Sequence, residues 1–170
     1  MCGFYKRFYQ SSKCNQSPHT FKYYKRNKIK NYYPGDDYID WIGISAYGPQ
    51  RWGENFQKFI DIMSPGYTQL TVLSDTKPIA ILEFGVADYL PHVNKEQWIK
   101  DALHTVQLPE FSRIKAIGWW HSTWINDDST MSAIQLDSSP ESIDAYKNGI
   151  SSDYFLSSYK LSNENLIKKP

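Results

Sequence analysis

Beyond residue 35, the chain alternates between short continuous apolar runs and longer stretches in which apolar residues recur at helical spacing. The apolar runs cover residues 40–47, 78–85 and 114–120. Runs of this length, bounded by Pro, Gly and Asp, are typical of strands buried on both faces of a parallel sheet. The sequence therefore predicts three parallel strands with a helical segment after each.

Two helices are predicted between the first two strands. Residues 55–62 place apolar side chains on one face, which predicts a first helix. Ser64-Pro65 is typical of an N-cap residue followed by proline at the first helical position. We therefore expect a second, separate helix that begins there and runs through Leu73.

The later helices carry clearer signals. Asn94, with Gln97 three residues on, matches the capping-box pattern, and an apolar stripe at helical spacing follows. Ser139 and Pro140 predict the start of a last helix, which Gly149 is expected to close. Alternating strands and helices predict an α/β fold with right-handed crossovers. Three parallel strands would leave open sheet edges, so we expect part of a larger architecture.

Composition narrows the range of ligands. Aromatic residues make up 16% of the 170 residues, with 13 Tyr and 6 Trp, and surplus Tyr and Trp often mark sugar-binding surfaces. The net charge is +1, but the first 35 residues hold eight of the 19 basic residues and no acidic one. The rest therefore carries 11 basic and 18 acidic residues, a net charge of −7. An acidic body disfavours a polyanionic partner, and no motif accompanies the basic segment, so we expect no nucleic-acid partner.

Other classes of protein are also disfavoured. No apolar run approaches the ~20 residues of a membrane span, so we expect no membrane partner. Cys2 and Cys14 form no zinc-binding spacing with His19, and we expect no metal and no cofactor. The basic, aromatic N-terminus lacks the apolar core and cleavage site of a signal peptide, which leaves the localisation open.

Glu83 is the most informative residue. It directly follows the apolar residues 78–82, and burying an unpaired carboxylate within such a strand is costly. A place at the C-terminal end of the strand avoids this cost, and parallel α/β folds carry their chemistry at that end. The structural alternative is a Glu that pairs with a neighbouring Lys or Arg.

All three predicted strands end in residues suited to a sugar site. These are Tyr47 after the first strand, Glu83 after the second, and Trp119, Trp120 and His121 after the third, with Trp124 beyond. Because side chains alternate along a strand, Glu83 is expected to face the same way as Ile79 and Ile81.

The two adjacent tryptophans are expected to face opposite ways. Trp120 shares its face with two small residues, which suits the crowded interior of a barrel, so it is favoured over Trp119 as the inward ring. His121 could bind a sugar hydroxyl or stabilise a turn, and the sequence leaves both open.

Residues 33–48, 77–85 and 114–120 occur in an order and at a spacing that resemble glycoside hydrolase family 26, the β-mannanase-type enzymes of the retaining (β/α)8-barrel clan. The resemblance implies that residues 32–156 form the C-terminal portion of a TIM barrel, strands six to eight with their helices, incomplete in this chain. Residues 1–31 are then a basic, aromatic N-terminal segment, and residues 157–170 a polar tail. The family's enzymes are often extracellular.

The resemblance also implies roles for the residues at the strand ends. The family's nucleophile ends strand seven, where Glu83 stands. An aromatic hydroxyl ending strand six contacts that nucleophile, which matches Tyr47. An aromatic ring at the end of strand eight forms the floor of the subsite that holds the reacting sugar. Trp120 or Trp119 matches this ring. The implied reaction is retaining, endo-acting cleavage of β-1,4-mannan or a related β-glycan.

The acid/base partner of such a nucleophile is not identified in this chain. The family's acid/base Glu ends strand four, and no acidic residue precedes Asp36. Glu54 and Asp88 follow predicted strand ends without a spacing that singles them out, whereas Asp127 and Asp128 are expected to cap a turn. We therefore expect the isolated chain to be impaired or inactive as a hydrolase.

Two alternatives stay open. The chain could be a non-catalytic carbohydrate-binding remnant that keeps Tyr47, Trp120 and Trp124 beside a broken carboxylate pair. It could instead be a subunit that completes its barrel with another chain. In each case the expected ligand is a β-linked polysaccharide or oligosaccharide.

Overall fold

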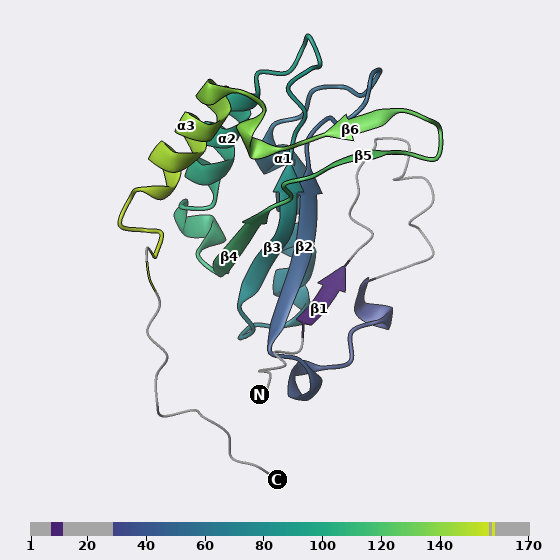
Figure 1. Ribbon diagram of the computed structural model, residues 1–170. Coiled ribbons are helices and arrows are strands. Elements are labelled where there is room, and N and C mark those ends of the chain that lie inside the picture. The colour runs from purple at the N-terminus through teal and green to yellow at the C-terminus, as the bar shows by residue number, and fades with distance from the viewer. Residues whose placement is uncertain (1–7, 12–28, 157, 159–170) are drawn as a thin grey trace, which may run out of the picture.

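The structure is a computed structural model in which residues 8–11, 29–156 and 158 are described (Figure 1). Its centre is a sheet of four parallel strands in the order β1-β2-β3-β4. The strands are β1 (Phe8–Ser11), β2 (Trp41–Tyr47), β3 (Ile79–Gly85) and β4 (Ile114–Trp119). The last three confirm the predicted strands, whereas β1 lies in a segment to which the sequence assigned no element.

Three α-helices and a hairpin complete the mixed α/β fold. The helices are α1 (Phe59–Leu73), α2 (Lys95–Thr105) and α3 (Pro140–Ile150), the antiparallel hairpin consists of β5 (Thr123–Ile125) and β6 (Met131–Ala133), and single 3-10 turns cover Ile29–Asn31, Asp36–Tyr38, Pro109–Phe111 and Leu136–Ser138. The part of the chain that the structure describes contains no helix of the length and apolarity needed to cross a bilayer.

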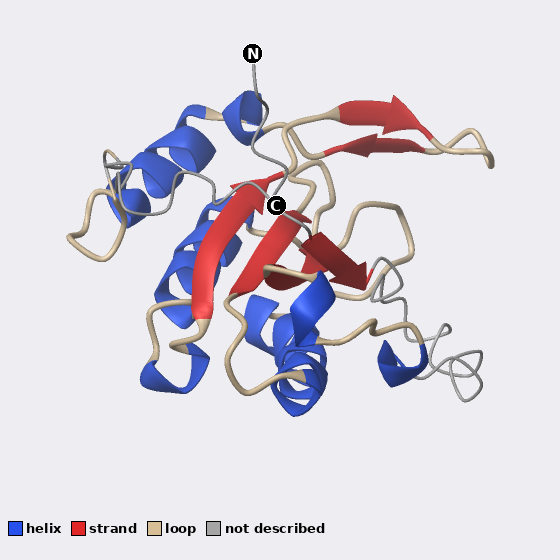
Figure 2. Ribbon diagram, turned by 90° about the horizontal axis from the view of Figure 1, so that it is seen from below, coloured by secondary structure: helices blue, strands red, loops and turns tan. Residues whose placement is uncertain are grey.

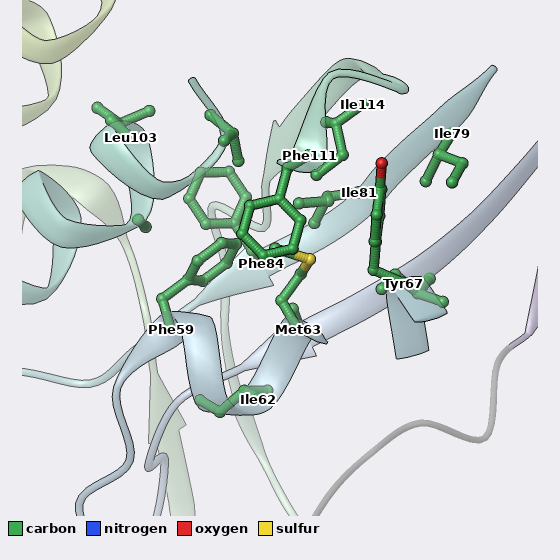
Figure 3. Close-up of a cluster of buried hydrophobic side chains, with 14 of the residues drawn as sticks. Phe59, Ile62, Met63, Tyr67, Ile79, Ile81, Phe84, Leu103, Phe111 and Ile114 are labelled. Carbon is green, nitrogen blue, oxygen red and sulfur yellow. The ribbon is translucent and has the colours of Figure 1, made fainter. Parts of the chain in front are cut away.

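The α-helices cover one face of the sheet, and the main core lies between the two layers (Figures 1 and 2). Figure 3 shows Phe59 and Met63 of α1 beside Ile81 and Phe84 of β3. Each fully buried large apolar side chain stabilises the fold by about 1.5–3 kcal/mol. This packing fixes the strands whose ends carry the candidate site.

The prediction of two helices before β3 is wrong, because α1 is continuous. Residues 55–58 are not helical, and Pro65 lies inside α1. Proline removes one backbone N–H donor from a helix. However, a buried stripe runs through the whole of α1: Phe59, Ile62, Met63, Gly66, Tyr67 and Leu70. Most helical stability in proteins comes from burying such a stripe, so packing overrides the local start signal.

The predicted starts of α2 and α3 are confirmed. The Asn94 side chain accepts the N–H of Gln97 at 2.8 Å, and the Ser139 hydroxyl accepts the N–H of Ser142 at 3.2 Å. The predicted apolar stripe of α2 is buried: Trp98, Ile99, Ala102, Leu103 and Val106.

Gly149 does not close α3, which contradicts the prediction. The helix runs on through Ile150. A Cβ atom on Gly149 would lie 2.3 Å from Cδ1 of Leu103 in α2. The glycine therefore allows α2 and α3 to approach each other closely.

β3 carries a bulge next to the candidate carboxylate. The register against both neighbouring strands shifts after Ile81, so Leu82 is an extra residue. Ile81 and Phe84 both lie in the core on the helix side although they stand three positions apart, which regular alternation does not allow. The prediction that Glu83 faces the same way as Ile79 and Ile81 is therefore wrong. The bulge turns Glu83 to the face away from the helices, where its hydrogen-bond partners lie.

Candidate functional site

A pocket of about 330 Å³ lies at the C-terminal ends of β2, β3 and β4. Its lining residues are Tyr47, Gln50, Glu83, Trp120, Ser122 and Trp124. Small-molecule sites commonly measure about 300–1,000 Å³, so this pocket suits a small ligand or one unit of a larger one. Four of the six predicted site residues lie together here, whereas Trp119 and His121 do not line the pocket.

Glu83 is held through one of its two carboxylate oxygens. Its Oε2 accepts hydrogen bonds from Ser45 Oγ at 3.1 Å and from Tyr47 Oη at 3.0 Å. None of the Lys and Arg residues that the structure describes forms an ion pair with Glu83. The structural alternative of a Glu paired with a neighbouring base therefore finds no support among them.

Tyr47 is a permanent hydrogen-bond donor to Glu83. Burial, and then the hydrogen bond and negative charge of Glu83, raise the pKa of the Tyr47 hydroxyl far above its ordinary value. The hydroxyl keeps its proton at physiological pH and donates a hydrogen bond to the carboxylate. This bond fixes the orientation of the carboxylate.

Trp119 and Trp120 lie on opposite faces of the sheet. The Trp120 backbone N–H donates to the Phe84 carbonyl at 2.9 Å, which extends the pairing of β3 and β4 to the pocket. The Trp119 ring meets that of Phe84 in the core at 5.0 Å between centroids, and its indole N–H donates to the Ile134 carbonyl at 2.8 Å. Trp120 is therefore the ring available to a ligand.

Trp124 enters the pocket from the β5–β6 hairpin, which the sequence analysis did not predict. Its indole N–H donates to Oδ1 of Asn126 at 3.0 Å. Arg51, in the loop after β2, donates to the same oxygen at 2.7 Å and forms an ion pair with Asp128 at 3.4 Å. These bonds tie the hairpin to the loop that also supplies Gln50.

His121 points to a turn and not to the pocket. Its Nδ1 accepts the backbone N–H of Leu136 at 3.1 Å, and its Nε2 lies 3.5 Å from Oδ1 of Asp137. Of the two roles left open by the sequence, this geometry favours the stabilisation of a turn.

Glu83 is the only carboxylate among the described residues that line the pocket. Glu54 accepts two backbone N–H groups of its own loop, at 2.7 and 3.3 Å, and neither it nor Asp88 lines the pocket. Asp128 accepts the N–H of Thr130 at 3.0 Å, so the predicted capping role is confirmed for this residue. Within residues 8–11, 29–156 and 158, no group of three or more His, Cys, Asp or Glu could hold a metal.

The sequence analysis missed three residues of the site. Ser45 stands two positions before Tyr47 on the same face of β2, so strand alternation was a usable signal. Gln50 and Ser122 lie in irregular segments after strand ends, where no periodicity indicates direction.

The chain is similar in sequence to a curated protein. No family model matches the sequence. Endoglucanase H of Acetivibrio thermocellus is 32% identical over 122 residues, which are 70% of this chain. The aligned part spans only 12% of the length of that curated relative.

Among solved structures, the chain is similar to a mutant of Saccharomyces cerevisiae Gas2p in complex with laminaritetraose and laminaripentaose. The similar region covers 86% of this chain and 30% of the Gas2p chain. The TM-score is 0.43 and the sequence identity 13%. This likeness is too slight to bear on fold or function.

Proposed function

We propose that this chain carries the nucleophile half of a retaining glycoside hydrolase site, with Glu83 as the nucleophile and a β-linked glycan as ligand. One observation carries the proposal: a carboxylate at the end of a parallel strand is oriented by two hydroxyls beside a pocket walled by Trp120 and Trp124. The 32% identity to a protein named Endoglucanase H supports it.

The proposed reaction begins with attack of Glu83 on the anomeric carbon of a bound sugar. In a retaining enzyme this attack forms a covalent glycosyl-enzyme, which water then cleaves. Tyr47 holds the orientation of the carboxylate through its hydrogen bond to Oε2, since its own proton stays in place. Trp120 and Trp124 offer ring faces for stacking against the sugar.

The described pocket supplies one carboxylate where a complete retaining site needs two about 5–5.5 Å apart. In our proposal β2, β3 and β4 correspond to strands six, seven and eight of a family 26 barrel, of which residues 32–156 form only the C-terminal portion. The acid/base then comes from outside the described pocket. A substrate whose leaving group needs no protonation would still react with Glu83.

The proposed substrate is a β-1,4-linked glycan. The resemblance to β-mannanases favours mannan, whereas the name of the curated relative favours a glucan. Trp and Tyr faces stack on either sugar, so the two configurations must be compared directly.

A fluorinated glycosyl fluoride, with fluorine in place of the 2-hydroxyl, tests the proposal without an acid/base. Fluoride leaves unprotonated, and the ring fluorine slows hydrolysis of the covalent product. The gluco and manno forms are incubated with the chain and analysed by intact-mass and peptide mass spectrometry. We expect one sugar per chain, attached at Glu83, for one configuration. No adduct with either form, or an adduct that persists in Glu83→Gln, would contradict the proposal.

A second candidate function is carbohydrate binding without catalysis, favoured by aromatic walls beside a single carboxylate. It predicts that cello- or manno-oligosaccharides change the tryptophan fluorescence while no adduct forms. Glu83→Gln should then bind the oligosaccharide as well as the parent chain does.

The subunit alternative predicts a stable complex with a second chain in size-exclusion chromatography. Residues 1–7, 12–28, 157 and 159–170, which belong to the proposed flanking segments, lie outside the described residues.

A further inference from the structure

The two oxygens of the Glu83 carboxylate are in different environments. Oε2 accepts from Ser45 Oγ at 3.1 Å and from Tyr47 Oη at 3.0 Å, and no hydroxyl or N–H of a described residue donates to Oε1. We propose that Ser45 is a positioning residue, which together with Tyr47 holds Oε2 so that Oε1 is the atom that attacks the sugar. This inference rests on the proposed function and assigns the roles of individual atoms within it.

The bulge in β3 is what makes this arrangement possible. Regular alternation would point Glu83 into the core with Ile81, where burial of a carboxylate is costly. Because Leu82 is an extra residue, Glu83 pairs with Ser45 across the sheet and reaches the face that carries the two hydroxyls. Ser45 is only 6% exposed, so packing holds its side chain in place.

The hydrogen-bond capacity of a carboxylate decides which oxygen remains reactive. Each oxygen has two lone-pair sites, and two hydroxyl donors occupy both sites on Oε2. The lone pairs of Oε1 stay available, and they belong to a residue that lines the pocket. Two donors on one oxygen also define the carboxylate plane better than one donor does.

The attack of Glu83 on a glycosyl fluoride needs no proton donor. An Oε1 lone pair forms a bond to the anomeric carbon of a glycosyl fluoride, and the carbon–fluorine bond breaks. The electron pair of that bond leaves with the fluoride ion. Ser45 and Tyr47 keep their protons throughout and change no bond order.

The test measures how fast the fluorinated glycosyl fluoride inactivates the full chain, as an inactivation rate constant and a separate half-saturation concentration. Ser45→Ala removes one hydroxyl. Since hydrogen bonds to charged groups contribute about 1.5–3 kcal/mol, we expect the rate constant to fall about tenfold or more. The half-saturation concentration should stay within about twofold, because Ser45 does not line the pocket. Ser45→Thr, which keeps the hydroxyl, should restore most of the rate.

Ser74→Ala is the matched control. Ser74 is also 6% exposed and also donates to a carboxylate, Oδ2 of Asp36 at 2.9 Å, but it caps the C-terminal end of α1 at the other end of the sheet. Its inactivation rate should equal that of the parent chain. If Ser45→Ala does not fold by circular dichroism, Ser45→Cys replaces it, because a thiol fills the space but donates only weakly.

The outcomes separate the two proposals. No labelling of the parent chain overturns the proposed function and this inference with it. Normal labelling of the parent chain and an unchanged rate in Ser45→Ala overturn the positioning role alone. An equal loss in Ser74→Ala would also overturn it, since the effect would then be general destabilisation.

Discussion

Trp119 and Trp120 are neighbours in the chain and have opposite surroundings. The partly buried Trp119 ring packs against the core, with its centroid 5.0 Å from that of Phe84 and 6.3 Å from that of Tyr146 in α3. The Trp120 ring lines the pocket and is 43% exposed. One step along β4 thus separates the face that stabilises the fold from the face that carries the candidate chemistry.

The difference shows that one face of the sheet stabilises the fold and the other carries the candidate site. On the helix side, buried rings and aliphatic side chains fill the space between layers. On the other face, Glu83, Tyr47 and Trp120 line the pocket, and Ser45 donates to the Glu83 carboxylate. Stability and binding should therefore respond to different substitutions, even at adjacent positions.

The largest expected effect is on the helix side. Trp119→Ala removes a ring that packs against the core and leaves the Ile134 carbonyl without its 2.8 Å donor. We expect a loss of about 3–5 kcal/mol in the free energy of unfolding, the usual cost of truncating a core aromatic residue. Urea denaturation measures it. Trp120→Ala should cost less than about 1 kcal/mol in the same experiment, and equal losses would break the comparison.

A second effect on the same side depends on pH. Lys95 at the start of α2 is 3% exposed, and its Nζ lies 5.6 Å from the centre of the Trp119 ring. Burial lowers the pKa of Lys95 from 10.5 to about 8, with smaller opposing contributions from Asp88 and Asp137. Between these two pH values the unfolded chain binds more protons than the folded one, so this group makes stability rise with pH.

The Lys95→Met variant isolates this contribution. Each pKa unit corresponds to about 1.4 kcal/mol, so the stability of the parent chain relative to the variant should rise by up to about 3 kcal/mol from pH 8 to 10.5. Below pH 8 the difference should be constant. Tyrosines titrate in both proteins and cancel. A flat difference across the whole range would show that the buried amine is not destabilised by its surroundings.

On the pocket side, Trp120→Ala should weaken sugar binding more than it weakens the fold. Truncating a tryptophan at a binding site often costs about 1–2 kcal/mol, roughly a tenfold loss of affinity. Calorimetric titration with a cello- or manno-oligosaccharide measures this loss. Trp52→Ala is a useful control, because Trp52 is an exposed tryptophan that does not line the pocket. A similar loss in both variants would mean that the oligosaccharide does not bind at the pocket that Trp120 lines.

The sequence predicts the strands and the helix starts better than it predicts the bulge that sets the direction of Glu83. Apolar runs revealed β2, β3 and β4, and side-chain caps revealed the starts of α2 and α3, because these signals are local. The bulge at Leu82 depends on packing between strands. A Cβ on Gly43 would lie 2.9 Å from Leu82 Cδ1, so the glycine in β2 makes room for the extra residue in β3. No single-strand pattern contains that information.

The hairpin was missed for a related reason. β5 and β6 have three residues each, too few for alternation to be recognised, and Ile125 and Met131 are exposed although apolar. Ser129 adopts a positive φ of 64° in the turn, a conformation that a serine at this position does not predict. The position of Trp124 therefore could not be derived, although the residue itself was identified as a candidate.

The smallest expected effect concerns how Trp124 is held opposite Trp120 in the pocket. Asn126 accepts from the Trp124 indole at 3.0 Å and donates to Ser132 Oγ, also at 3.0 Å. Asn126→Ala removes these two bonds together with those to Arg51 and Thr130. Because the partners in this partly exposed hairpin can bond to water instead, we expect a net loss of about 1 kcal/mol in unfolding free energy. The Trp124 indole N–H signal in ¹H–¹⁵N NMR spectra, assigned with Trp124→Phe, should shift and exchange faster with solvent. Asn126→Asp keeps the acceptor and should preserve that signal, while it loses the bonds that Nδ2 donates to Thr130 and Ser132. If the indole signal is unchanged in Asn126→Ala, packing alone holds the ring, and the bond between Trp124 and Asn126 does not position the pocket wall.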